Sequence, residues 1–87
     1  MKIVKKGQAG TMQSSDLMVT VEPAEELVIE IQSTVKKQFE HLIRARLEEV
    51  LQRCAVTAGK ISISDRGALD YAIEARLEAA LGRAGGE

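Results

Sequence analysis

Two adjacent hydroxyls and a carboxylate, Ser14-Ser15-Asp16, stand directly before a run of alternating apolar residues. A serine hydroxyl takes part in covalent chemistry when a neighbouring base activates it, or when a separate enzyme attaches a group to it. Serine and aspartate are also common turn residues, because their side chains hydrogen-bond to nearby main-chain groups. By composition alone these residues therefore predict a turn that leads into a β-strand.

Two other side chains with chemical potential have ordinary structural explanations. His41 falls on the polar face of a predicted helix and has no evident orienting partner, which is typical of a surface residue. Cys54 ends the apolar stripe of the same helix, where a thiol usually serves packing. One cysteine and one histidine leave no ligand set for a structural zinc site. The sequence therefore predicts no catalytic and no metal-binding residue.

Composition limits the class of protein. Eighty-seven residues are enough for one domain, residues 1–87, and 45% hydrophobic with 29% charged residues is typical of a soluble globular protein. Twelve basic and thirteen acidic residues give a net charge of −1, and the chain has one Phe, one Tyr and no Trp. These features disfavour a nucleic-acid partner. The apolar runs are too short for a membrane span or a signal peptide, so we expect a cytoplasmic protein without a membrane partner.

The periodicity of apolar residues predicts three strands. Residues 17–22 and 27–32 alternate between apolar and polar positions on either side of Pro23, which predicts a hairpin over residues 17–32. Residues 60–64 alternate in the same way and predict a further strand. Residues 1–16 lack such a pattern, and we expect them to form a loosely structured arm.

Two helices are predicted from apolar stripes with helical spacing. The first follows a cap at Ser33 or Thr34, and the second follows a cap at Asp65, with residues 83–87 as a frayed tail. The predicted buried stripes are Val35, Phe39, Leu42, Ile43, Leu47, Val50, Leu51 and Cys54 in the first helix, and Ala68, Leu69, Ala72, Ile73, Leu77, Ala80 and Leu81 in the second. The predicted fold is a two-layer α+β sandwich, in which two helices cover one face of a small, mainly antiparallel sheet.

Several separated blocks of sequence point to a family. They are Met1-Lys2-Ile3, Ala9-Gly10-Thr11 with Ser14 and Asp16, Pro23, Ser33-x-Val35-x-Lys37-Gln38-Phe39, Asp65-x-Gly67-Ala68-Leu69-Asp70 and Ala75-Arg76-Leu77-Glu78-Ala79. On these blocks the chain resembles the acyl carrier subunit (gamma chain) of citrate lyase over nearly its whole length. The Asp-Ser-Leu attachment motif of four-helix acyl carriers is a different pattern, since here the order is Ser15-Asp16-Leu17 before a strand.

The resemblance implies a carrier and not a catalyst. It implies that 2'-(5''-phosphoribosyl)-3'-dephospho-coenzyme A is joined through a phosphodiester to Ser14, placed there by a prosthetic-group transferase. The thiol of this group would carry acetyl and citryl thioesters between the transferase (alpha) and lyase (beta) subunits, while citrate is cleaved to acetate and oxaloacetate. A tethered thioester reaches both active sites at high effective concentration.

The resemblance leaves alternatives open. The family commonly has glycine at the position of Ser15, whose second hydroxyl makes it the other candidate for attachment. The acyl carrier subunit of malonate decarboxylase is the related alternative. An unmodified protein-interaction module, with a bare Ser14, is the alternative from a different class.

Overall fold

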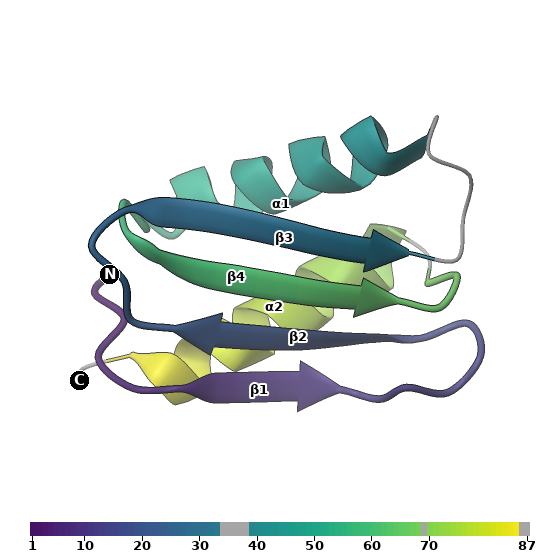
Figure 1. Cartoon of the computed structure of the whole chain (residues 1–87), viewed down its shortest axis with the longest axis horizontal. Coiled ribbons are helices and arrows are strands. Elements are labelled where there is room, and N and C mark those ends of the chain that lie inside the picture. The colour runs from purple at the N-terminus through teal and green to yellow at the C-terminus, as the bar shows by residue number, and fades with distance from the viewer. Residues whose placement is uncertain (34–38, 69, 86–87) are drawn as a thin grey trace.

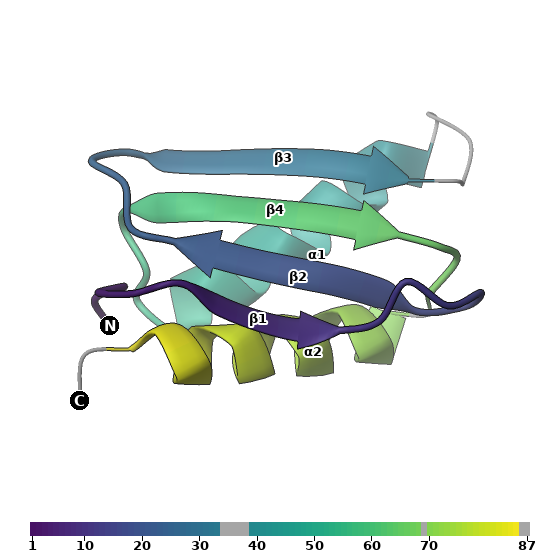
Figure 2. The same cartoon turned by 60° about the horizontal axis from the view of Figure 1, so that its bottom comes forward.

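The computed structural model describes residues 1–33, 39–68 and 70–85 of the chain. Within these residues, its elements are the strands and helices β1 (Gly7–Gly10), β2 (Leu17–Glu22), β3 (Leu27–Ser33), α1 (Glu40–Arg53), β4 (Gly59–Asp65) and α2 (Asp70–Ala84). The strands form one sheet, and both helices lie against the same face of it (Figure 1 and Figure 2). The predicted two-layer α+β sandwich is confirmed.

The sheet has the strand order β1-β2-β4-β3. β2 runs antiparallel to both of its neighbours, whereas β3 runs parallel to β4. Along β2 and β4 every second residue is buried, so these two central strands supply the sheet side of the core. Val19 lies opposite Ile63 and Val21 opposite Ile61, and all four side chains are almost fully buried. The alternation predicted for residues 17–22 and 60–64 is therefore confirmed.

The predicted hairpin over residues 17–32 is wrong, because β4 lies between β2 and β3 (Figure 1). Apolar alternation identifies the buried face of a strand but contains no information about its neighbours. Here β3, α1 and β4 form a crossover unit, which is the connection that two parallel strands require. The hairpin that does form joins β1 to β2 through residues 11–16.

The predicted loose arm at residues 1–16 is also wrong at residues 7–10, since these form β1, which pairs with β2 along its whole length. A Cβ at Gly7 would lie 2.3 Å from the carbonyl oxygen of Ala80, so β1 approaches α2 too closely for any larger residue. This contact uses small residues in place of an apolar alternation, which explains why the sequence pattern did not reveal the strand.

The predicted frayed tail over residues 83–87 is contradicted at its start. Ala84 is fully buried in the last turn of α2, and its carbonyl oxygen accepts a hydrogen bond from the Val4 N–H at 2.9 Å. Ile3, which is 6% exposed, forms an isolated bridge with Gly85. The segment before β1 therefore lies against the end of α2, and residues 86–87 lie outside the described residues.

Among the described residues, α1 begins at Glu40 and α2 at Asp70. Ser33 is the last residue of β3, and the residues that a cap at Ser33 or Thr34 would hold lie outside the described residues, as do Val35 and Leu69. α1 buries Ile43, Leu47, Val50 and Leu51, but Phe39 and Leu42 are 46% and 54% exposed instead of buried. In α2 the side chains of Ile73, Leu77, Ala80 and Leu81 are buried as predicted, with Ala84 added. Among the described residues, neither helix is long and apolar enough to cross a membrane.

Candidate functional site

The loop between β1 and β2 presents both candidate hydroxyls at the surface. Ser14 and Ser15 are exposed and lie in a turn in which the Asp16 N–H donates to the Gln13 carbonyl oxygen at 3.2 Å. Because β2 is antiparallel to β4, this loop lies at the sheet edge where the parallel strands β3 and β4 end (Figure 1). This is the edge at which open α/β sheets usually bind ligands.

The carboxylate of Asp16 fastens this loop to α2. Its Oδ2 accepts hydrogen bonds from the Thr11 hydroxyl at 2.6 Å and from Nη2 of Arg76 at 3.0 Å. Its Oδ1 accepts from the Leu17 N–H at 2.8 Å and from Nε of Arg76 at 3.3 Å. The hydroxyl of Thr11, the N–H of Leu17 and the guanidinium of Arg76 favour the charged carboxylate, and together they lower the pKa of Asp16 from 3.8 to about 2.

A second loop, between β4 and α2, holds the same turn from its other side. The Ser15 N–H donates to the Arg66 carbonyl oxygen, and the Arg66 N–H donates to the Asp16 carbonyl oxygen, both at 2.8 Å. Ser15 has a φ of +64°, in the left-handed region that favours glycine. Both loops are therefore joined through their backbones on the residues that follow Ser14.

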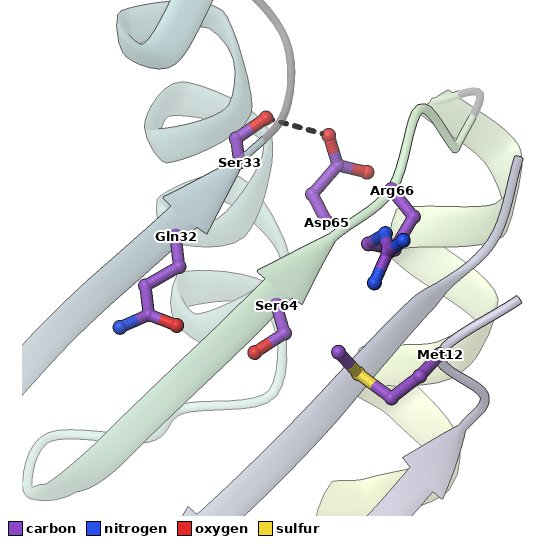
Figure 3. A pocket seen from close by; sticks show the side chains of 6 residues that line it. All are labelled: Met12, Gln32, Ser33, Ser64, Asp65 and Arg66. Atoms are coloured by element: carbon purple, nitrogen blue, oxygen red, sulfur yellow. Dashed lines mark hydrogen bonds between the residues drawn. The ribbon is translucent and has the colours of Figure 1, made fainter. Parts of the chain in front are cut away.

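A cavity of about 210 Å³ opens beside these loops (Figure 3). The residues that line it are Met12, Gln32, Ser33, Ser64, Asp65 and Arg66. Asp65 is only 2% exposed, and its carboxylate accepts from the Ser33 hydroxyl at 2.8 Å and from the Ala68 N–H at 2.9 Å. It thus ends β4 and orders the following turn, instead of capping α2 as predicted, since α2 begins at Asp70.

The arrangement can present a hydroxyl to another protein but is poorly suited to activating it. Asp16, the neighbouring carboxylate, already accepts four hydrogen bonds and has a pKa of about 2, so it is a weak base near neutral pH. His41 is exposed on α1, which lines neither the cavity nor the loop, and Cys54 is partly buried against the core. Among the described residues, no three His, Cys, Asp or Glu side chains are grouped to hold a metal ion.

Sequence reasoning gave no role to Thr11, Arg66 or Arg76, which the structure brings around the serines. Two of them do stand in the blocks that carry the family resemblance, Thr11 with Asp16 and Arg76 near the end of the chain. The structure brings these two blocks into contact, at 3.0 Å between Nη2 of Arg76 and Oδ2 of Asp16. The presence of both blocks, the one with Thr11 and Asp16 and the one with Arg76, was the signal in the sequence that could have pointed to these residues.

Comparison with known proteins identifies relatives along nearly the whole chain. The family described as ACP: Malonate decarboxylase delta subunit (MdcD) matches residues 4–84. A citrate lyase acyl carrier protein of Haemophilus influenzae (strain PittGG) is 48% identical, over 97% of this chain and 88% of the relative. Another, of Cronobacter sakazakii (strain ATCC BAA-894), is 53% identical with the same coverage.

A solved structure shares the fold. It is a Pseudomonas malonate decarboxylase hetero-tetramer in complex with malonate, one chain of which has a TM-score of 0.69 and 25% sequence identity, over 98% of this chain and 93% of that chain. The family match and the names of the curated relatives support a carrier subunit and not a catalytic one. The chain belongs to the family of acyl carrier proteins that includes the citrate lyase acyl carrier proteins.

Proposed function

We propose that this chain is the acyl carrier subunit of citrate lyase and carries 2'-(5''-phosphoribosyl)-3'-dephospho-coenzyme A on Ser14 through a phosphodiester. The observation that carries the proposal is the identity of 48–53% to citrate lyase acyl carrier proteins, together with an exposed serine on a turn that is held on both sides. When bound, the group supplies a thiol on which acetyl and citryl units travel as thioesters.

Ser14 is favoured over Ser15 because the two positions serve different purposes. With a φ of +64°, Ser15 occupies a conformation that glycine adopts at lower cost, and glycine is the usual residue of the family there. Glycine has no hydroxyl, so a family that usually has glycine at this position cannot use it for attachment. Ser14 has no such backbone requirement, and its exposed hydroxyl remains the candidate.

The residues around Ser14 fit a group that is attached by another enzyme. Thr11, Arg76 and the main chain at Arg66 hold the turn in one conformation, so the hydroxyl is presented to a prosthetic-group transferase at a defined place. Because Asp16 is a weak base, the transferase has to activate the hydroxyl itself. The partners we propose are this enzyme and the transferase (alpha) and lyase (beta) subunits of citrate lyase.

The acyl carrier subunit of malonate decarboxylase is the second candidate. The description of the matching family and the Pseudomonas structure support it, but the identity to that structure is 25% against 48–53% for the citrate lyase relatives. Reconstitution separates the two. The loaded chain should restore citrate cleavage to citrate lyase lacking its carrier, and should not restore malonate decarboxylation; the reverse result would favour the second candidate.

Intact-mass analysis of the chain from its own host tests the attachment. We expect a covalent adduct that fragments to a dephospho-coenzyme-A piece and that is lost in Ser14→Ala but kept in Ser15→Ala. An unmodified chain, in cells whose modifying enzymes are active, would support the unmodified interaction module instead. Loading that survives Ser14→Ala would move the attachment to Ser15.

A further inference from the structure

Arg66 differs from the other arginines in having an uncommitted side chain. Within the part of the chain that the structure describes, its exposed guanidinium makes no hydrogen bond or ion pair. Each of the others has a partner: Arg44 the Ile29 carbonyl oxygen, Arg46 Glu49, Arg53 Glu74 and Glu78, Arg76 Asp16, and Arg83 the Gln8 carbonyl oxygen. An arginine without a partner beside a candidate attachment site is available to bind an anion.

The backbone places Arg66 directly beside the serine turn. Its carbonyl oxygen accepts from the Ser15 N–H and its N–H donates to the Asp16 carbonyl oxygen, each at 2.8 Å. Arg66 is thus held next to the residue that follows Ser14, and its side chain also lines the cavity of about 210 Å³ (Figure 3). The backbone of Arg66 and that of Ser15, the neighbour of Ser14, are hydrogen-bonded to each other, which reduces the entropy lost when the side chains of Arg66 and a modified Ser14 pair.

Among the described residues, the two carboxylates beside Arg66 in the chain and across the loop already have hydrogen-bond partners. Asp16 accepts from Thr11, Leu17 and Arg76, so the guanidinium of Arg76 is engaged as well. Asp65 accepts from the Ser33 hydroxyl, to which its carboxylate points in Figure 3, and from the Ala68 N–H. The remaining side chains that line the cavity, Met12, Gln32 and Ser64, are uncharged.

We infer that the guanidinium of Arg66 binds the phosphate carried on Ser14, and that the cavity beside it accommodates the polar unit next to that phosphate. The inference rests on the proposed function, because that function puts a phosphodiester on Ser14. Guanidinium is charged at every physiological pH and binds two phosphate oxygens at once. Gln32 and Ser64, which lie opposite each other in the β3–β4 register, offer an amide and a hydroxyl to a sugar. Arg66 would hold the first link of the arm at the sheet edge.

A phosphoserine installed at position 14 of the full chain provides a direct probe. It puts a phosphate on the same oxygen without the modifying enzymes, and its second pKa, ordinarily near 6, can be followed by ³¹P NMR. Arg66 should lower that pKa by about half a unit compared with Arg66→Gln, a modest shift because the site is exposed. Arg66→Lys should keep part of the shift, since it keeps the charge but loses the planar fork.

Arg44→Gln is the matched control, because Arg44 is also exposed but lies on α1 and does not line the cavity. Arg66 has no side-chain partner among the described residues, so its variants should fold and melt like the unchanged protein. An identical phosphoserine pKa in the unchanged chain and in Arg66→Gln would overturn the inference. So would an Arg44→Gln shift as large as that of Arg66→Gln, which would indicate general charge.

The outcome is separable from that of the proposed function. A loaded Ser14 by intact mass, without an effect of Arg66 on the phosphoserine, would leave the carrier function in place and reject the phosphate contact. A lowered phosphoserine pKa that depends on Arg66, in a chain that is never loaded in its host, would keep the phosphate contact and reject the carrier function.

Discussion

The two ends of the strand order, β1 and β2 at one end and β3 at the other, are covered by their helices to different degrees. On the side of β1, β2 and α2, which we call the sealed half, Leu17, Val19 and Val21 are fully buried and β1 touches the helix through Gly7. On the side of β3 and α1, the open half, Leu27 and Val28 are 40% and 42% exposed, and the helix leaves Phe39 and Leu42 in solvent. The loop with Ser14 belongs to the sealed half. The hydroxyl that we propose as the attachment point is therefore held by the better packed part of the molecule.

The largest expected contrast between the halves comes from one pair of leucine truncations. Leu77→Ala in α2 removes a fully buried side chain and should cost about 2–5 kcal/mol of unfolding free energy. Leu42→Ala in α1 removes a side chain that is 54% exposed and should change it by about 0.5 kcal/mol or less. Chemical denaturation measures both. Equal costs would show that Leu42 is as well packed as Leu77 and would contradict the exposed edge of α1.

Two glycine substitutions should have opposite signs. Gly7→Ala puts a Cβ 2.3 Å from the Ala80 carbonyl oxygen, a backbone atom, and should destabilise by about 1–3 kcal/mol. Gly82→Ala on α2 meets no atom within 4 Å and should stabilise the helix by about 0.5–1 kcal/mol. Thermal unfolding of the two variants tests the close contact between β1 and α2. A neutral Gly7→Ala would contradict it.

The anchor at Asp16 should show itself as a pH dependence of stability. Because its folded pKa of about 2 lies below the ordinary 3.8, its stabilising contribution is present above pH 4 and is lost as the pH falls toward 2. Asp16→Asn should therefore destabilise the chain at pH 7, and most of this difference from the unchanged protein should vanish by pH 2. Denaturant midpoints across that range measure it. A difference that stays constant down to pH 2 would show that the charge of Asp16 is not responsible.

The smallest effect is expected at the turn itself. Ser15→Gly relieves a left-handed φ of +64°, which costs about 1–2 kcal/mol for a residue with a Cβ, but glycine regains about 0.4–1 kcal/mol of freedom in the unfolded chain. The net result should be a stabilisation of about 0.5 kcal/mol. Ser14→Gly, where φ is not positive, should be destabilising instead. Thermal unfolding compares them, and the opposite order would contradict the described turn.

Much of the fold could be predicted because periodicity is a local property. The alternation in residues 17–22 and 60–64 correctly identified the buried faces of β2 and β4, and the helical spacing identified Leu47 and Leu77. The prediction failed where an element is held by close tertiary packing and not by a periodic pattern of apolar residues. Gly7 and Ala9 form a strand by fitting under α2, and Leu42 matches the apolar stripe of α1 but lies beyond the edge of the covered face.

The site shows the same division. The resemblance to a known family made Ser14 the candidate for attachment and marked Ser15 as the unusual position, and Ser15 has the positive φ that favours glycine. The partners of the turn could not be predicted from local pattern. Arg76 follows Asp16 by sixty positions, and the Arg66 backbone meets Ser15 only because two loops end at one edge of the sheet.

By itself, the sequence determined which face of each central strand is buried, which turn presents the serines, and which family the chain resembles. These follow from residue type and spacing, which are contained in short segments. Only the tertiary structure decided that β4 separates β2 from β3, that α2 seals β1, and that the Arg66 backbone pairs with the turn at Ser15. Those features depend on which distant segments pack together. The packing that forms is the one that buries the apolar surface of the whole chain, which no short segment determines.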